Sequence, residues 1–188
     1  EGFIVNELAR LGSNFRKNID LEEYLIQHDI PGIQGIDTRN LTKIIRNIGC
    51  MNGMITTTKY ENLDEVMKRI HAFKVTGVVE QTTCKESYTI GTGDKRVALL
   101  DYGAKANIAK SLVKRGCQVT VYPASTPASV ILKEKYDGIM LSNGPGDPEE
   151  NVQIIEEIKL LASSQTPIFA ICLGHQLMAL ATGADTEK

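Results

Sequence analysis

The stretch Pro167-Ile168-Phe169-Ala170-Ile171-Cys172-Leu173-Gly174-His175-Gln176 decides the fold that we expect for this chain. An apolar run of strand length ends at Cys172, and a run of helix formers then continues to Gly183. The pattern predicts a strand, a sharp turn and a helix, with the cysteine on the turn and its side chain exposed. Gly174 fits such a turn because a Cβ there would collide with tightly bent backbone.

A cysteine on such a turn is a candidate nucleophile. The N-terminus of a helix carries about half a positive elementary charge and has free backbone N–H groups, and both favour a thiolate. The alternative is that Cys172 is a small apolar residue at the end of a buried strand. The residues upstream favour the first interpretation.

The composition indicates a globular protein and excludes several classes of function. With 188 residues, 42% hydrophobic and 23% charged, the chain can form one large or two small domains. A net charge of −2 gives no electrostatic reason to expect nucleic acid or an anionic membrane as a partner. No apolar run reaches the roughly 18 residues of a membrane span, and no signal peptide opens the chain. Four dispersed cysteines without a C-x-x-C pair argue against a zinc site or a disulfide framework and favour a cytoplasmic location.

Residues 1–90 are expected to form part of a smaller domain of mixed helices and strands. Asp20, Asp37 and Asn62 each precede a helical pattern, in the position of an N-cap. Apolar residues at helical spacing predict buried faces on the second and third helices. We expect helices over 20–28, 36–48 and 62–70 and a strand over 51–58, with buried faces formed by Leu41, Ile44, Ile45 and Ile48 and by Leu63, Val66, Met67 and Ile70.

A polar, glycine-bearing stretch at 85–95 marks a linker, of which 91–95 separates the first domain from residues 96–188. Beyond it, apolar strands alternate with amphipathic helices. This alternation predicts an α/β fold, a flavodoxin-like parallel sheet with helices on both faces. We expect strands over 96–101, 118–122, 137–141 and 168–171 and helices over 107–115, 128–135 and 149–164, the last with Val152, Ile155, Ile158 and Leu161 on one buried face.

Ligands of parallel sheets bind beyond the carboxyl ends of the strands. This rule selects the stretches 101–105 and 142–148 together with Cys172. A phospho-acceptor receiver would need an aspartate at the end of the third strand, where this chain has Ser142 and Asn143, so we exclude that function. A phosphate loop is excluded as well, because no Gly-Lys-Ser/Thr sequence follows the glycines.

The loop 142–148 has two glycines, Gly144 and Gly146, separated by a proline, so its backbone can approach a ligand closely while staying stiff. If its strand neighbours the strand before the cysteine, N–H groups of Gly144 or Gly146 would face the thiol. Together with the N–H of Leu173 they would form an oxyanion hole for acyl transfer. The alternative is a plain strand-to-helix turn in which Asp147 caps the helix.

No convincing general base accompanies the cysteine. His175 is three residues from Cys172, but its ring would have to fold back over the start of the helix, whereas a base normally approaches from another loop. We expect a structural role for His175. His28 and His71 lie in the first region on predicted helices and are expected to be packing or surface residues.

With these motifs in place, the sequence resembles the triad class I glutamine amidotransferases, and within them the small subunits of carbamoyl phosphate synthetases. The resemblance covers nearly the whole chain, and the first region separates these subunits from relatives in anthranilate, aminodeoxychorismate or GMP synthesis. The stretches that carry it are 169–176, 141–148, 13–16, 36–39 with Leu41 and Thr42, Asn52-Gly53, and 101–105 with Asn107.

The resemblance implies a glutaminase mechanism. Cys172 would attack the side-chain amide of glutamine to give a glutamyl thioester and ammonia, and the N–H groups of Leu173 and Gly144 would hold the oxyanion. Gly146 and Gln176 would contact the substrate. The ammonia would pass to a large synthetase subunit, which would bind ATP and Mg²⁺ and build carbamoyl phosphate for pyrimidines and arginine. The resemblance implies no cofactor and no metal in this chain itself.

The chain departs from the family pattern at both ends, since it starts without methionine and stops soon after Cys172. The family's catalytic histidine and its glutamate partner occur downstream of Lys188, and a substrate-contacting serine occurs upstream of Glu1. We therefore expect an incomplete amidotransferase domain that is inactive alone. The competing interpretations are a non-catalytic flavodoxin-like interaction module and the amidotransferase component of another glutamine-dependent synthase.

Overall fold

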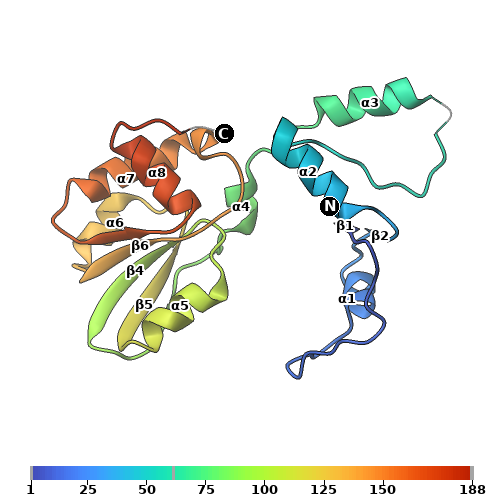
Figure 1. Cartoon of the computed structure of the whole chain (residues 1–188). Helices are drawn as coiled ribbons and strands as arrows, with labels where there is room; N and C mark the ends of the chain where they lie inside the picture. Colours follow the sequence, from blue (N-terminus) through green and yellow to red (C-terminus); the bar gives the residue numbers. More distant parts are fainter. Residues whose placement is uncertain (1, 61, 187–188) are drawn as a thin grey trace. The chain divides into compact units, whose positions relative to one another are not determined.

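The structure is a computed structural model that describes residues 2–60 and 62–186 (Figure 1). The chain forms two compact units, Glu1–Lys74 and Val75–Lys188. The boundary therefore lies earlier than the predicted linker at 91–95. Part of the predicted linker is a strand, β3 (Tyr88–Ile90), which pairs in antiparallel direction with β5 (Cys117–Pro123). This pairing makes residues 88–90 of the predicted 85–95 linker stretch part of the sheet of the second unit.

Among its described residues, 2–60 and 62–74, the first unit has three helices and a short parallel strand pair. The predicted helices are confirmed as α1 (Leu21–Gln27), α2 (Thr38–Ile48) and α3 (Leu63–Ala72). The strands β1 (Phe3–Ile4) and β2 (Gly32–Ile33) pair in parallel.

Two of the three predicted caps of the first unit are confirmed. The Asp37 carboxylate accepts the backbone N–H of Asn40 at 2.9 Å, and the Asn62 side chain accepts the N–H groups of the first turn of α3. The cap at Asp20 is wrong, because this side chain makes no capping hydrogen bond and instead pairs with Lys17 at 2.6 Å.

Other predictions for the first unit are wrong. Residues 51–58 form no strand; the Thr56 hydroxyl accepts the N–H of Thr58 at 3.0 Å, a local turn that competes with extended pairing. The predicted buried faces of α2 and α3 are mostly exposed. Ile48 is 70% exposed and Leu63 is 71% exposed, whereas Val66 is buried.

The second unit is a five-stranded sheet in the order β3-β5-β4-β6-β7, with β4 (Lys95–Asp101), β6 (Gly138–Leu141) and β7 (Ile168–Ala170). All neighbouring strands run parallel except the edge strand β3. The predicted α/β fold and the predicted strands of this unit are confirmed. The helices are α4 (Val78–Thr82), α5 (Ala106–Val113), α6 (Ala128–Lys133), α7 (Val152–Ala162) and α8 (Leu173–Ala181), with a short 3-10 turn η1 (Pro148–Glu150) before α7.

The sheet buries both of its faces because successive side chains of a strand point to opposite sides. Ala98 and Leu100 of β4 pack in one core cluster with residues of α6, α7 and α8, while Leu99 packs in a second cluster with Ala109 of α5. Figure 1 shows α5 on the side of the sheet opposite to these three helices. The predicted helices on both faces are thus present.

Two apolar residues of the second unit depart from the predicted burial. Phe169 of the edge strand β7 is 66% exposed. It lies in register with Met140, so both residues are on the face of the sheet that α5 covers. This helix packs near β5 and does not cover the edge of the sheet where β7 lies. Val152 is 61% exposed because it is the first residue of α7, and the buried face of this helix is formed further along, by Ile158 and Leu161.

Candidate functional site

The candidate site is the turn between β7 and α8. Cys172 has φ 51° and ψ −111°, close to the values of the first central residue of a type II′ turn, a position that usually requires glycine. A non-glycine residue held there carries backbone strain, which is concentrated at functional sites in proteins. The Cys172 side chain is exposed, as predicted, and the apolar alternative of a buried core cysteine is wrong.

The turn is attached to the end of β6. The N–H of Ile171 donates to the carbonyl of Leu141 at 3.0 Å, and the N–H of Gly174 donates to the carbonyl of Ser142 at 3.0 Å. A Cβ on Gly174 would lie 2.6 Å from each of these two carbonyl oxygens. Glycine is therefore required at this position, because the first turn of α8 rests directly on the end of the neighbouring strand.

The strand preceding the glycine loop and the strand preceding the cysteine are neighbours, which was the condition for an oxyanion hole. β6 and β7 pair in parallel, with Leu141 opposite Ala170. A Cβ on Gly144 would come within 2.7 Å of Cδ2 of Leu173, so the loop lies against the residue that follows the cysteine. Within the described residues, the backbone N–H groups of Gly144 and Leu173 donate to no other group.

The loop is anchored by side chains at the ends of β4 and β6. The Ser142 hydroxyl, fully buried, accepts the N–H of Tyr102 at 2.9 Å and donates to the carbonyl of Asn143 at 2.8 Å. The Asn143 side chain accepts the N–H of Lys105 at 3.0 Å and donates to the carbonyl of Gly103 at 3.3 Å. Two polar side chains thus connect the loops that follow two adjacent strands.

Asp101, also buried, organises the loop that these side chains contact. Its carboxylate accepts the N–H groups of Gly103 and Ala104, at 2.9 and 2.6 Å, and that of Cys84 at 2.9 Å. Burial, followed by the neighbouring Asp101 carboxylate, raises the pKa of the Cys84 thiol. The sequence pattern selects the strand end at Asp101 without indicating a role for this side chain. In the structure its carboxylate holds the backbone of 101–104.

The two other predicted substrate contacts are exposed. Gly146 has φ 91°, which favours glycine, and its turn lies next to Val78 of α4, beside a cavity of about 60 Å³. Gln176 lies in the first turn of α8, where its N–H donates to the carbonyl of Cys172 at 3.0 Å. The Asp147 side chain caps η1 by accepting the N–H of Glu149 at 3.2 Å, so the capping role considered as the alternative exists together with the close approach of Gly144.

The histidines occupy the positions that we expected. His175 is exposed on α8, and no hydrogen bond joins its ring to Cys172 in the part of the chain that the structure describes. His28 stacks on Tyr24 with 4.1 Å between ring centroids and hydrogen-bonds the Tyr24 carbonyl. Among the same residues, no group of three or more Cys, His, Asp or Glu side chains could hold a metal ion.

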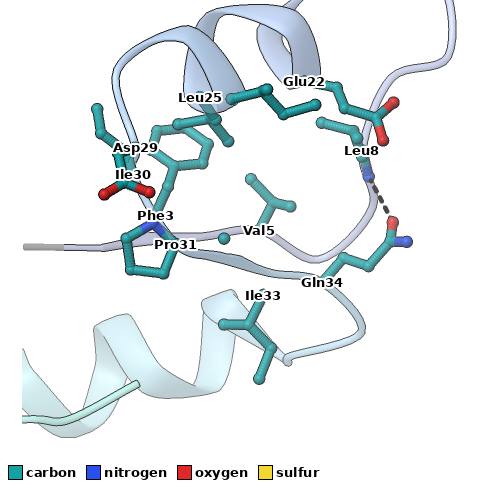
Figure 2. Close-up of a pocket in the computed structure, with 12 residues that line it drawn as sticks. Phe3, Val5, Leu8, Glu22, Leu25, Asp29, Ile30, Pro31, Ile33 and Gln34 are labelled. Carbon is teal, nitrogen blue, oxygen red and sulfur yellow. Dashed lines mark hydrogen bonds between the residues drawn. The ribbon is translucent and has the colours of Figure 1, made fainter. Parts of the chain in front are cut away.

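A separate cavity of about 680 Å³ lies in the first unit, between α1 and the β1–β2 pair (Figure 2). Its lining is largely apolar, with Phe3 and Leu25 facing the same space, and the backbone N–H of Leu8 donates to the Gln34 side chain at 3.2 Å. Among its described lining residues there is no cysteine or histidine. The candidate thiol is the one at the Cys172 turn.

Each of the two units contains residues that match a known protein family. Residues 98–188 match the family described as glutamine amidotransferase class-I, and residues 1–55 match the CPSase domain of the carbamoyl-phosphate synthase small chain. Over its whole length the chain is 45% identical to the carbamoyl phosphate synthase small chain of Clostridium perfringens and covers 53% of that protein. It is also 45% identical to the carbamoyl phosphate synthase pyrimidine-specific small chain of Bacillus subtilis, and covers 51% of it. The chain thus spans about half the length of these relatives.

Proposed function

We propose that this chain is part of the glutamine-hydrolysing subunit of a carbamoyl phosphate synthetase. Two family matches support the proposal: residues 98–188 match the class I glutamine amidotransferases, and residues 1–55 match the CPSase domain of carbamoyl-phosphate synthase small chains. The observation that carries the proposal is the strained, exposed Cys172 beside the unpaired N–H groups of Gly144 and Leu173. The proposed reaction converts glutamine and water to glutamate and ammonia.

In the first proposed step, the Cys172 sulfur attacks the side-chain amide carbon of glutamine. The carbonyl oxygen becomes negative as the carbon becomes tetrahedral, and the N–H groups of Gly144 and Leu173 donate to it. Donors of this kind, fixed before the reaction, stabilise the transition state because they need no reorganisation as the charge develops. Collapse of the intermediate breaks the carbon–nitrogen bond and leaves a glutamyl thioester on Cys172.

The leaving nitrogen has to be protonated before it departs as ammonia, and water must then be activated to hydrolyse the thioester. His175 is poorly placed for either task. We propose that polypeptide beyond residues 1–188 supplies the histidine and glutamate for these steps, as the family resemblance implies. Gly146 and Gln176 are the proposed glutamine contacts on this chain.

The proposed partner is the large synthetase subunit. It would receive the ammonia and bind the ATP and Mg²⁺ used to form carbamoyl phosphate for pyrimidine and arginine synthesis. We propose a cytoplasmic location for the complex. No helix among residues 2–60 and 62–186 combines the length and apolar character that a membrane span needs.

The test is ammonia release from glutamine by the full-length polypeptide assembled with its partner. Cys172→Ala should abolish turnover, whereas Cys50→Ala, which removes an exposed thiol in the first unit, should leave it unchanged. The isolated segment 1–188 should release no ammonia above background. Turnover that survives Cys172→Ala, or Cys172-dependent turnover by the isolated segment, would contradict the proposed division of roles.

A further inference from the structure

We propose that Ser142 and Asn143 are positioning residues that hold one peptide group of the loop 142–148 in a fixed orientation. The N–H of Gly144 then stays directed at the developing negative oxygen. The inference rests on the proposed function and goes beyond it, since neither side chain touches the substrate in that mechanism. It assigns the control of catalytic geometry to a buried serine hydroxyl.

The peptide group between Asn143 and Gly144 is the element that has to be held. Its carbonyl belongs to Asn143 and its N–H belongs to Gly144, and in a trans peptide these two groups point in opposite directions. No backbone group of the described residues hydrogen-bonds to either of them. Regular secondary structure therefore does not determine which way this peptide faces.

The Ser142 hydroxyl does determine it. It donates to the Asn143 carbonyl at 2.8 Å, and this directs the Gly144 N–H away from the hydroxyl. The hydroxyl is itself oriented, because its oxygen accepts the N–H of Tyr102 at 2.9 Å, and because complete burial excludes competing water. If the peptide turned over, the carbonyl would replace the N–H beside the reacting oxygen, and a donor would become a repelling acceptor.

The Asn143 side chain restrains the same residue from the other direction. Its amide oxygen accepts the N–H of Lys105 and its amide nitrogen donates to the carbonyl of Gly103, so both ends of the side chain are attached to the loop after β4. That loop is rigid, because the Asp101 carboxylate accepts two of its N–H groups. A Cβ on Gly103 would lie 2.8 Å from Cδ of Pro145, so the two loops are also in close contact. The Asn143 side chain therefore fixes the Cα from which the 143–144 peptide turns, and the hydrogen bond from Ser142 sets which way that peptide faces.

The test compares Ser142→Ala with Ser164→Ala in the full-length polypeptide assembled with its partner. Ser164 is a matched control: its hydroxyl also donates to a backbone carbonyl, that of Leu161 at 2.7 Å, and accepts a backbone N–H, that of Thr166 at 3.3 Å. It lies before β7, at the opposite end of that strand from Cys172. Asn143→Asp is the second variant, since it keeps the acceptor for Lys105 and removes the donor to Gly103.

Removing a direct oxyanion donor costs about 10²- to 10³-fold in kcat. Loss of the hydrogen bond from the Ser142 hydroxyl leaves the Gly144 N–H present but misdirected part of the time. Ser142→Ala should therefore lower kcat about 10- to 100-fold, with KM within about threefold of the wild type. Asn143→Asp should shift the two constants in the same way. Alkylation of Cys172 by iodoacetamide should keep its wild-type rate in both variants, because the turn that exposes the thiol is intact. Ser164→Ala should leave kcat unchanged.

The inference is overturned if a folded Ser142→Ala protein keeps the wild-type kcat, or if only KM rises. It is also overturned if Cys172 alkylation slows in parallel with kcat, which would mean that the cysteine turn itself had moved. Should Ser142→Ala fail to fold, wild-type turnover by folded Asn143→Asp would refute it. If wild-type protein shows no Cys172-dependent turnover, the proposed function itself fails, and that outcome is distinct from all of these.

Discussion

Substituting Gly174 by alanine tests whether the contact between α8 and the end of β6 controls catalysis. The new Cβ would lie 2.6 Å from the carbonyl oxygens of Leu141 and Ser142, which is about 0.9 Å inside the distance of roughly 3.5 Å at which non-bonded atoms attract each other best. Both oxygens belong to backbone, so no flexible side chain can relieve the overlap. The start of α8 has to move, and the N–H of Leu173 moves with it.

The expected effect on stability is small and the expected effect on activity is large. Overpacking costs about 1–3 kcal/mol, and alanine in a helix recovers about 1 kcal/mol relative to glycine, which leaves about 0–2 kcal/mol of destabilisation. A displacement of about 1 Å in a catalytic group can cost about 100-fold in rate. Gly174→Ala should therefore lower kcat about 100-fold while Tm falls by at most a few degrees.

The assay is glutamine hydrolysis by the full-length polypeptide with its partner, together with thermal unfolding of the same samples. Gly138→Ala is the matched control in the same sheet, because a Cβ at Gly138 would meet only the Pro167 carbonyl, at 3.6 Å, and its backbone conformation suits alanine. This control should keep its wild-type kcat. A Gly174→Ala protein with kcat within about threefold of the wild type would refute the reasoning.

Two further predictions concern titrating groups of the second unit. Iodoacetamide should label the exposed Cys172 faster than Cys84, whose pKa is raised by burial and by Asp101. The labelling of Cys84 should increase only at a higher pH than the labelling of an ordinary thiol. Mass spectrometry of peptides labelled across a pH series measures both rates, and faster labelling of Cys84 at neutral pH would contradict the site geometry. The hydrogen bond from the Arg96 N–H, followed by Lys95, lowers the pKa of Asp137. The Asp137 carboxylate therefore stabilises the fold at pH values above its ordinary pKa of about 3.9. This stabilisation is lost as the pH falls through the lowered pKa. Asp137→Asn should lower Tm at pH 7 and make progressively less difference below about pH 4; a difference in Tm that is independent of pH would exclude this contribution.

The fold of the second unit could be predicted because its local patterns agree with its tertiary structure. The apolar strands β4, β5 and β6 are buried on both faces, so their continuous hydrophobic runs are informative. The first unit was predicted less well. Its helices follow from periodicity and caps, but the burial of Ile48 and Leu63 depends on which other elements cover them, and periodicity alone carries no such information.

The same distinction applies to the site. The exposed cysteine turn and the adjacent Gly144 loop were predictable, because both follow from the ends of neighbouring parallel strands. The roles of Ser142 and Asn143 were not, since their partners lie about 40 residues away in the sequence, on the loop after β4. Polar residues at two adjacent strand ends were the only available signal, and it indicates a place without specifying the hydrogen bonds.

The central claim is that Cys172 forms the covalent intermediate, and the most direct measurement is acid quenching of the assembled full-length enzyme during turnover of glutamine, followed by peptide mass spectrometry. We expect a thioester-linked glutamyl group on the peptide that contains Cys172, sensitive to hydroxylamine and absent from Cys172→Ala. Turnover without any adduct on that peptide under conditions where thioester breakdown is rate-limiting, or an adduct on Cys50, Cys84 or Cys117 instead, would contradict the account.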